Sequence, residues 1–361
     1  MSEINAVDLF CGLGGASIGL QWAGVNVIGA VDVDQEALDV YQNNPVEVEP
    51  FQADLKDVTF QQIADHYGFH KRDVDLVVGC PPCQNFSYLR DTDPWPEDEP
   101  KDELLKAFCC RVEEADPDYV LFENVPGIAS KDEGQYLNWL KNTMDDLGYK
   151  RDIDNLNAAD YGVPQYRRRT IGLFVKKNVG VSPELPSPTH IDPENQEDSE
   201  RKPWETVEDT ISDLPPLEAG EEWDEDPAHR ASNHQKSTID RIKAVPKDGG
   251  SRTDIEDPKH ELDCHKNLEN SFTAKNVYGR MAWKKPAPTL TTRCTTPSCG
   301  RFIHPEQNRG ISFREAARLM GFPDFELPDK NGAAEKVIGN AVPPLLIKKT
   351  NMFILNNPSF F

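Results

Sequence analysis

The feature that most constrains the fold is a regular alternation of apolar runs and helical patterns over the first half of the chain. The apolar runs have the length and composition of strands that are buried on both faces. They are "AVDLF" (6–10), "NVIGAVD" (26–32), "VDLVVG" (74–79), "DYVLFEN" (118–124) and "RTIGLFV" (169–175). Helical patterns lie between them, at 34–44, 101–115 and 132–148. This alternation predicts an α/β fold with a doubly wound, mostly parallel sheet of the Rossmann type.

The pattern changes near residue 180. From there to about 300 the chain is rich in Pro and acidic residues and has no clear period. Order returns at "SFREAARLMGFPD" (312–324), where Ser312 and Glu315 have capping-box spacing, and 335–355 predicts one apolar helix. We therefore expect a catalytic domain of residues 1–180 plus 326–361, and a smaller irregular domain with a hinge at 181–325.

The charge, the apolar runs and the N-terminal residues argue against a membrane-spanning or exported protein. The chain has 39 Lys and Arg against 62 Asp and Glu, a formal charge of −23, which predicts a solvated surface or adaptation to a salty cytoplasm. No apolar run reaches the roughly 18 residues of a membrane span. No basic or apolar leader precedes the first strand, so we expect a cytoplasmic protein. The eight scattered cysteines predict reduced thiols.

A glycine turn follows the first predicted strand. "DLFCGLGGASIGL" places three glycines before a helix, where the backbone can turn tightly and approach a ligand: Gly12, Gly14 and Gly15. Ser17 stands where a dinucleotide fingerprint has its third glycine, which argues against NAD. Asp32 and Asp54 end the next two strands, and such acids commonly accept hydrogen bonds from ribose hydroxyls. The pattern suits a nucleoside cofactor without a pyrophosphate, S-adenosylmethionine, or else a turn that only shapes the fold.

The stretch "GCPPCQNFS" (79–87) has three interpretations. A metal site would need two ligands besides Cys80 and Cys83, and no second convincing C-x-x-C exists, so we expect no metal. A thioredoxin-like redox pair would begin a helix, whereas a Pro- and Asp-rich loop follows here. The third interpretation is a single nucleophile, Cys83, which two prolines present at the carboxyl end of a strand.

Two neighbouring segments offer partners for a nucleophile. Glu123 ends the following predicted strand on the same rim as Cys83, and a partly buried carboxyl there could donate to a substrate ring nitrogen. Arg167 and Arg169 stand at i, i+2, which in an extended segment point to one side. Surface salt bridging is the alternative for the two arginines.

The chain as a whole resembles a DNA cytosine-5 methyltransferase of the bacterial or archaeal restriction-modification type, in an acidic, halophile-like form. The matching segments stand in the family's order. They are "DLFCGLGG", "PPCQNFS", "ENVPG", "QYRRR", "RGISFREAARLMGFPD" and "IGNAVPP".

The resemblance implies a catalytic set. Cys83 would add as a thiolate to C6 of a flipped-out cytosine, because C6 and C5 are stacked in the duplex. Glu123 would hold or protonate N3, and Arg167 and Arg169 would orient the base. C5 would then take the methyl group of S-adenosylmethionine, which leaves S-adenosylhomocysteine, and loss of the C5 proton would expel the thiolate. Pro82 and Asn124 complete the set.

The resemblance also implies a cofactor set. Phe10 would pack on the adenine, Asp32 would bind the ribose and Asp54 the adenine amine, while Asn340 and the residues after it would close the pocket. The full set is Phe10, Gly12, Leu13, Gly14, Gly15, Asp32, Val33, Asp54, Leu55, Pro81, Asn340, Ala341 and Val342.

By the same resemblance, 181–325 would be the target-recognition domain that reads the DNA. The locally basic stretch 279–302 is the best DNA-facing candidate, with a generic solvated loop as the alternative. The predicted DNA contacts are Gln84, Ser87, Arg280, Lys284, Arg293 and Arg301.

The leading hypothesis is a monomeric, S-adenosylmethionine-dependent enzyme that methylates C5 of cytosine in specific duplex DNA sequences, with a cognate restriction endonuclease as a further partner. The first alternative is an RNA (tRNA) cytosine-5 methyltransferase of the same fold, against which Gln84 argues. A non-catalytic DNA-binding relative is the second, although Cys83, Glu123, Arg167 and Arg169 are all retained. A thiol oxidoreductase built on Cys80 and Cys83 would leave the other matches unexplained.

Overall fold

The computed structural model of the chain describes residues 4–82, 102–130, 134–195, 200–260, 262 and 276–356. These residues form two compact units. The sheet unit comprises 1–157, 168–188 and 342–361, and the irregular unit comprises 158–167 and 189–341. The catalytic and target-recognition domains are functional assignments, so their limits stay a prediction. The unit limits differ from them chiefly in 158–167 and 326–341, which pack within the irregular unit.

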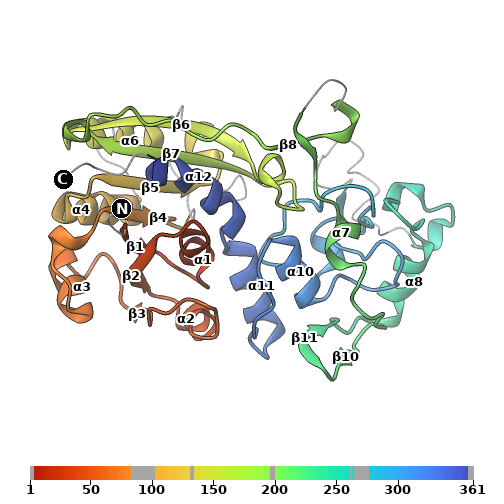
Figure 1. The fold of residues 1–361 in the computed structure, drawn as a ribbon. Helices are drawn as coiled ribbons and strands as arrows, with labels where there is room; N and C mark the ends of the chain where they lie inside the picture. The colour runs from red at the N-terminus through yellow and green to blue at the C-terminus, as the bar shows by residue number, and fades with distance from the viewer. Residues whose placement is uncertain are drawn as a thin grey trace. The chain divides into compact units, whose positions relative to one another are not determined.

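The sheet unit is built on a seven-stranded sheet in the order β3-β2-β1-β4-β5-β7-β6 (Figure 1). Strands β3, β2, β1, β4 and β5 run parallel, and β7 is antiparallel to both β5 and β6. The predicted doubly wound, mostly parallel sheet is confirmed. The strands are β1 (Asn5–Leu9), β2 (Asn26–Asp32), β3 (Phe51–Gln52), β4 (Leu76–Gly79), β5 (Tyr119–Asn124), β6 (Tyr149–Asn157) and β7 (Arg168–Lys176).

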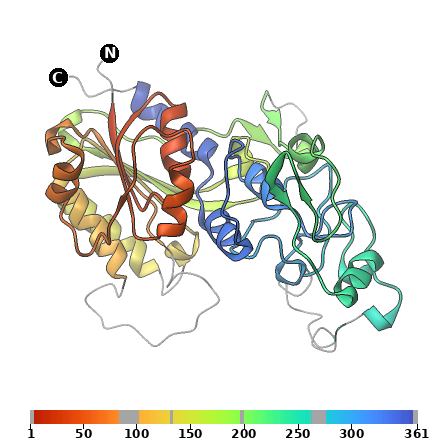
Figure 2. The same cartoon turned by 90° about the horizontal axis from the view of Figure 1, so that it is seen from below.

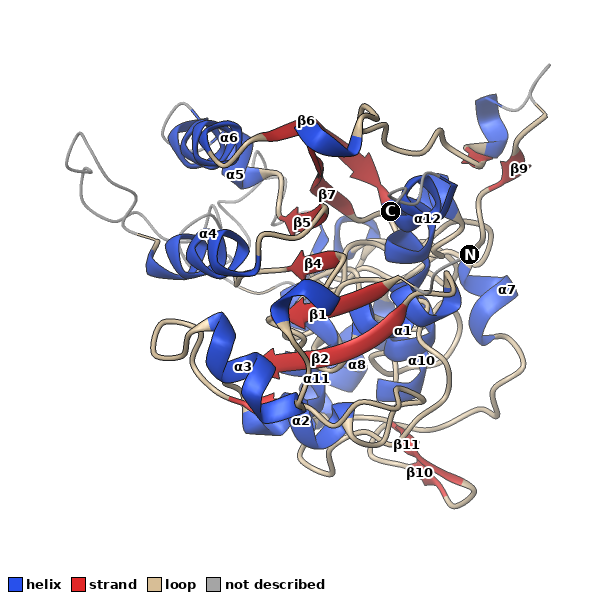
Figure 3. Ribbon diagram, turned by 60° about the vertical axis from the view of Figure 1, so that its left-hand side comes forward, coloured by secondary structure: helices blue, strands red, loops and turns tan. Residues whose placement is uncertain are grey.

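Helices cover both faces of this sheet. Helices α3, α4 and α6 lie along one side, and α1 and α12 pack together on the other (Figures 2 and 3). Every residue of β4 and β5 is therefore buried, as expected for the central strands of such a sheet. The helices of the unit are α1 (Gly15–Trp22), α2 (Gln35–Tyr41), α3 (Phe60–Tyr67), α4 (Glu103–Ala115), α5 (Gly127–Ser130), α6 (Gln135–Asp146) and α12 (Pro344–Asn356).

Three elements differ from the sequence-based expectation. Strand β6, "YKRDIDNLN", is an edge strand whose residues are mostly exposed or half-buried, so it lacks the apolar run of a central strand. Helix α3 begins at a capping box formed by Thr59 and Gln62, a signal that the sequence analysis missed. The single helix expected at 335–355 is wrong: α11 (Asn331–Asn340) and α12 are separate, because Pro343 and Pro344 cannot continue a helix.

The irregular unit has short elements and relies on buried polar contacts. Arg309 and Glu315 form a bidentate ion pair with distances of 2.7 and 2.8 Å, and both side chains are buried. Burial alone would raise the pKa of Glu315, but the Arg309 guanidinium lowers it to about 2. The elements are β8 (His190–Ile191), β9 (Lys202–Pro203), α7 (Val207–Ile211), β10 (Glu222–Trp223), β11 (Asp226–Arg230), α8 (Lys236–Ala244), α10 (Phe313–Leu319) and α11.

In the described part of the chain, no helix has both the length and the apolar character needed to cross a membrane.

Candidate active site at the carboxyl edge of the sheet

The parallel strands end at one edge of the sheet, and the strand order reverses between β1 and β4. Binding sites of open α/β sheets lie at this edge, next to such a reversal. Phe10 follows β1, Asp32 ends β2, Cys80 follows β4, and Glu123 and Asn124 end β5. The topology therefore gathers the predicted catalytic and cofactor segments of the sheet unit at one edge.

The glycine turn after β1 is held by Asp32. Gly12 has φ 54° and Gly14 has φ 98°, conformations that favour glycine. The Gly12 N–H donates to Asp32 Oδ2 (2.8 Å), and the Asp34 N–H donates to Oδ1 (2.9 Å). Desolvation raises the pKa of Asp32. Each carboxylate oxygen can accept a second hydrogen bond, so Asp32 can both fix the turn and bind a hydroxyl group.

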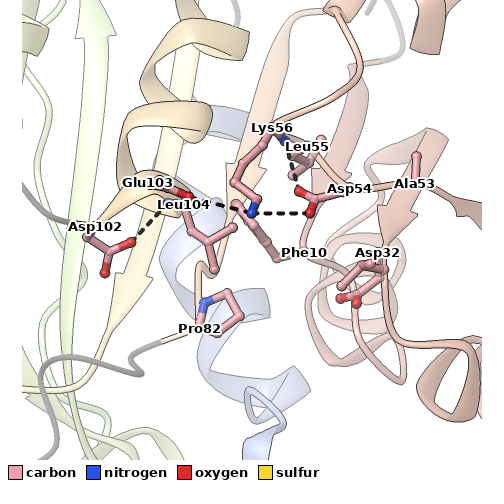
Figure 4. Close-up of a pocket in the computed structure, with 11 residues that line it drawn as sticks. Phe10, Asp32, Ala53, Asp54, Leu55, Lys56, Pro82, Asp102, Glu103 and Leu104 are labelled. Carbon is pink, nitrogen blue, oxygen red and sulfur yellow. Dashed lines mark hydrogen bonds and ion pairs between the residues drawn. The ribbon is translucent and has the colours of Figure 1, made fainter.

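A pocket of about 330 Å³ opens beside this turn (Figure 4). Phe10 contributes to its wall and has φ 64°, a backbone conformation that aromatic residues rarely adopt outside functional or strained sites. Lys56 Nζ lies 3.5 Å from Asp54 Oδ2 and 3.6 Å from Glu103 Oε2. The lining residues are Phe10, Asp32, Val33, Ala53, Asp54, Leu55, Lys56, Pro82, Asp102, Glu103 and Leu104.

The pocket brings together Phe10, Asp32, Val33, Asp54 and Leu55 from the predicted cofactor set. Other members of the set lie elsewhere. Gly12, Gly14 and Gly15 shape the turn and the start of α1, and the Leu13 carbonyl accepts a hydrogen bond from Asn44. Val342 is buried in the sheet unit, while Asn340 and Ala341 belong to the irregular unit.

Sequence reasoning missed the pocket residues around the start of α4. Asp102 is the N-cap of α4 and accepts hydrogen bonds from the N–H groups of Leu104 (3.0 Å) and Leu105 (3.1 Å). An acidic residue directly before a helical pattern is a recognisable N-cap signal, but it does not indicate a pocket. Lys56 carried no signal beyond its place two residues after Asp54.

Glu123 and Arg169 form the central ion pair of the edge. Arg169 Nε lies 2.8 Å from Glu123 Oε1, and the two side chains are 11% and 7% exposed. Strands β5 and β7, which carry them, are antiparallel neighbours, so the pair joins adjacent strands. A carboxylate and a guanidinium thus lie together at the carboxyl end of β5, with little access to water.

Arg167 makes its hydrogen bonds within the irregular unit. Its guanidinium is buried in the irregular unit and donates to the carbonyls of Leu290 (2.9 Å), Gly339 (3.0 Å) and Ala341 (2.9 Å). Strand β7 begins at Arg168, so Arg167 directly precedes the strand and Arg169 lies within it. The structure places the Arg169 guanidinium beside Glu123.

The chain after β4 leads toward the predicted nucleophile. Cys83, Gln84 and Ser87 lie outside the described residues. Asn124 Nδ2 donates to the Pro81 carbonyl (3.1 Å), and Asn124 Oδ1 accepts from the Val125 N–H (2.8 Å). Asn124 therefore links the end of β5 to the segment that precedes Cys83, and Pro82 lines the pocket.

Cys80 has the chemistry of an inert thiol. Desolvation, together with the carboxylates of Glu123 and Asp8, raises the pKa of its thiol well above the usual value. It therefore stays protonated near neutral pH, which does not suit a redox nucleophile. Among the described residues, no group of three or more His, Cys, Asp or Glu side chains could hold a metal ion.

Asp8 is a fully buried acid beneath the glycine turn. Its Oδ2 accepts a hydrogen bond from the Ser17 hydroxyl (2.6 Å), which in turn accepts from the Tyr41 hydroxyl (3.0 Å). Within the described residues, Asp8 Oδ1 has no hydrogen-bond partner. Burial raises the pKa of Asp8 to about 7.

This shift predicts a pH-dependent stability. Folding raises the pKa of the Asp8 carboxyl. The contribution of Asp8 to the free energy of unfolding is therefore fully present below the pKa that Asp8 has in the unfolded chain, and it is lost as the pH rises toward about 7. We expect Asp8→Asn to gain about 3 kcal/mol of unfolding free energy relative to the native chain between about pH 5 and pH 8. Denaturant unfolding of both proteins at fixed ionic strength measures this. A difference that stays constant with pH would contradict the assignment.

The predicted DNA contacts of the irregular unit fall into two groups. All five guanidinium N–H groups of Arg280 are used, on the carbonyls of Ile242, Val245, His304 and Gln307 and on Asn308 Oδ1. Arg301 Nη1 donates to the carbonyls of Gly249, Gly250 and Arg280. Both arginines thus stabilise loops, and Arg280 has no donor left for a phosphate.

The other two predicted contacts are exposed. Lys284 is ion-paired with Glu208, so its charge is partly neutralised. Arg293 is exposed, and within the described residues its side chain forms no hydrogen bond or ion pair. Of the four cations proposed here, Arg293 is the one that the structure leaves available to a polyanion.

Known proteins resemble this chain over most of its length. Residues 4–355 match the model of the family described as C-5 cytosine-specific DNA methylase. The chain is 36% identical to the Type II methylase M.HgiDII of Herpetosiphon aurantiacus, covering 94% of this chain and 92% of that protein. It is 32% identical to the Type II methyltransferase M1.HphI of Haemophilus parahaemolyticus, covering 95% and 84%.

Solved structures show the same architecture. A crystal structure described as that of a DNA modification methyltransferase encoded within a prophage (E. coli) superimposes with a TM-score of 0.72 at 25% identity, over 98% of this chain and 99% of that one. The Dnmt2 methyltransferase of S. pombe has the same fold, with a TM-score of 0.62 at 17% identity, over 99% of this chain and 100% of that one.

Proposed function

This chain belongs to the C-5 cytosine-specific DNA methylase family, and from that premise we propose that it methylates C5 of a flipped-out cytosine in specific duplex DNA sequences through attack by Cys83. The observation that carries the proposal is the shielded Glu123–Arg169 pair at the carboxyl edge of the sheet. Asn124 fixes the segment that precedes Cys83 beside the same strand end. The cofactor pocket lies at this edge as well.

The lining of the pocket fits S-adenosylmethionine. Asp32 has hydrogen-bonding capacity left for ribose hydroxyls, and Phe10, Val33 and Leu55 provide apolar walls for a purine. Among the lining residues that the structure describes, Lys56 is the one cation, and it is shared by Asp54 and Glu103. The lining is thus net acidic, which disfavours a pyrophosphate and suits a cationic sulfonium. When bound, the cofactor supplies an electrophilic methyl group.

We expect Asp32→Asn to weaken cofactor binding by about 10- to 100-fold, because hydrogen bonds to a charged group contribute about 1.5–3 kcal/mol. The substitution removes the charge and replaces one acceptor oxygen with an amide that cannot accept from a main-chain N–H. Isothermal titration of S-adenosylmethionine into each protein measures the affinity. Asp39→Asn, at an exposed position of α2, is the matched control and should bind as the native chain does. Equal affinities for all three proteins would exclude Asp32 from the site.

Cys83, Glu123 and Arg169 have separate roles in the proposed reaction. The Cys83 thiolate forms a bond to C6 of the cytosine while the protonated Glu123 carboxyl gives its proton to N3, so the negative charge of the thiolate ends on the Glu123 carboxylate beside Arg169. Arg169 keeps the Glu123 carboxyl in position and offers its other N–H groups to the base. C5, now nucleophilic, gains the methyl group. Loss of the C5 proton to a base restores the ring and expels the thiolate.

Duplex DNA is the proposed substrate, and the irregular unit is the proposed reader of its sequence. The exposed Arg293 is the cation proposed to contact the backbone. The names of the relatives support a restriction-modification role, and a partner endonuclease, a monomeric state and a cytoplasmic location belong to the same proposal.

One assay tests the function. Labelled methyl transfer from S-adenosylmethionine is measured with duplex DNA and with tRNA, and the duplex product is then digested to nucleosides. We expect label in duplex DNA, recovered as 5-methylcytosine. Label in tRNA and none in DNA would establish the RNA alternative, and label in neither would favour a non-catalytic relative.

A further inference from the structure

A short exposed segment of the irregular unit, at residues 291–293, lies between two buried residues. Thr291, Thr292 and Arg293, here called the tip, are all exposed, while the residues on either side, Leu290 and Cys294, are 1% and 0% exposed. The Thr296 N–H donates to the Arg293 carbonyl (3.1 Å), which closes a turn after the tip. The tip is therefore an exposed segment whose two flanking residues are buried.

The first anchor, before the tip, is made by Arg167 and α11. The Arg167 guanidinium donates to the carbonyl of Leu290 and to the carbonyls of Gly339 and Ala341 at the end of α11. A side chain at Gly339 would lie 2.3 Å from the main chain of Thr291 and Thr292, so this glycine allows α11 to touch the tip directly.

The second anchor, after the tip, is Glu335, one helical turn before Gly339. Its Oε1 accepts hydrogen bonds from the Thr295 N–H (3.0 Å), the Thr295 hydroxyl (2.5 Å) and the Thr296 hydroxyl (3.2 Å). Glu335 is 9% exposed and Thr295 is fully buried. A nearly buried carboxylate that takes three bonds from one loop is strongly constrained, because charge-assisted hydrogen bonds are among the strong ones.

We propose that Glu335 is a positioning residue for DNA binding, whose carboxylate holds the tip so that Arg293 meets a phosphate of the duplex backbone. This inference rests on the proposed function. Glu335 lies in the interior and reaches its partners through Thr295 and Thr296, so it acts on DNA only through the tip. The chemistry it serves is that of a phosphate diester, which a guanidinium binds without reading the base.

The salt dependence of DNA binding tests whether Glu335 positions Arg293. Each phosphate contact adds about 0.9 to the slope of log Kd against log salt concentration. We expect Arg293→Ala to lower that slope by about one and to weaken binding about five-fold at roughly 0.15 M salt. Glu335→Ala should do the same, because a released tip no longer presents Arg293. The double variant should show no further loss, since both changes remove one contact.

Two variants separate positioning from general stability. Glu335→Gln keeps the Oε1 acceptor that all three bonds use, so it should restore the native slope. Arg72→Ala removes an exposed arginine that precedes β4 at the opposite edge of the sheet, and it should leave the slope unchanged. If Glu335→Ala does not fold, judged by circular dichroism and cofactor titration, Thr295→Val removes a single donor and should lower the slope partly.

Fluorescence anisotropy with a labelled duplex, titrated over a range of KCl, measures every slope. A native slope in Glu335→Ala, or effects of Glu335→Ala and Arg293→Ala that add in the double variant, would overturn the inference while the proposed function stands. Failure of the native chain to bind duplex DNA at all would overturn both.

Discussion

Replacing Cys83 with serine is expected to stop methyl transfer, with a fall in single-turnover rate on the order of 10⁴-fold or more. A thiolate is accessible near neutral pH and is both a good nucleophile and a good leaving group, whereas a serine alkoxide is neither accessible nor easily expelled. The assay follows labelled methyl transfer to duplex DNA with the cofactor in excess.

Cys80→Ala is the matched control for this variant. The raised pKa of Cys80 keeps its thiol protonated, so its loss should leave methyl transfer within a few-fold of the native rate. Full activity in Cys83→Ser would refute the mechanism. A collapse of activity in both variants would instead support a function that needs the C-x-x-C pair.

Glu123→Gln carries the second largest expected effect, a fall in rate of about 10²- to 10³-fold at unchanged cofactor affinity. Glutamine has nearly the shape of glutamate but cannot give a proton to N3. It also leaves the Arg169 guanidinium, 11% exposed, without its partner carboxylate. Single-turnover methylation measures the effect on the reaction rate, and titration with S-adenosylmethionine measures the effect on cofactor affinity.

Glu113→Gln, at an exposed position of α4, is the control and should be fully active. If Glu123→Gln methylated DNA at the native rate, the Glu123–Arg169 pair would be structural and the proposed division of roles would fail. A loss confined to cofactor affinity would place Glu123 in the cofactor site instead.

Much of the sheet could be predicted because its central strands are buried on both faces. "VDLVVG" and "DYVLFEN" are nearly continuous apolar runs, and β4 and β5 are buried at every position. The parallel order then follows from the alternation with helices, and the carboxyl ends of the strands must share one edge. The proximity of Phe10, Asp32 and Asp54 around one pocket could therefore be predicted from the sequence.

The roles of the arginines could not be predicted in the same way. The letters "QYRRR" show neither that β7 begins at Arg168 nor that carbonyls from residues 290, 339 and 341 surround Arg167. Arg280 likewise stands in a basic stretch, yet the acceptors of its five donors come from residues 242–308. Burial of a cation by distant main-chain carbonyls is a tertiary property that local sequence does not carry.

The residues that line the pocket could also be predicted only in part from the sequence. The sequence predicts Asp54 from its place at a strand end but not Lys56 and Glu103, because the contact between these two depends on how the start of α4 packs against the segment that follows β3. The broken helix near 343 is a different case. There the sequence shows both prolines, and the break that they impose on a helix outweighs the apolar run.

The covalent intermediate is the central claim, and a duplex with 5-fluorocytosine at the target position tests it most directly. Fluorine replaces the C5 proton whose loss would release the enzyme, so attack at C6 followed by methyl transfer leaves a stable protein–DNA adduct. Mass spectrometry of the digested adduct should find the modified base on the peptide that contains Cys83, with no adduct in Cys83→Ser. An adduct on another residue, or methylation of normal duplex without any trapped adduct, would contradict the account.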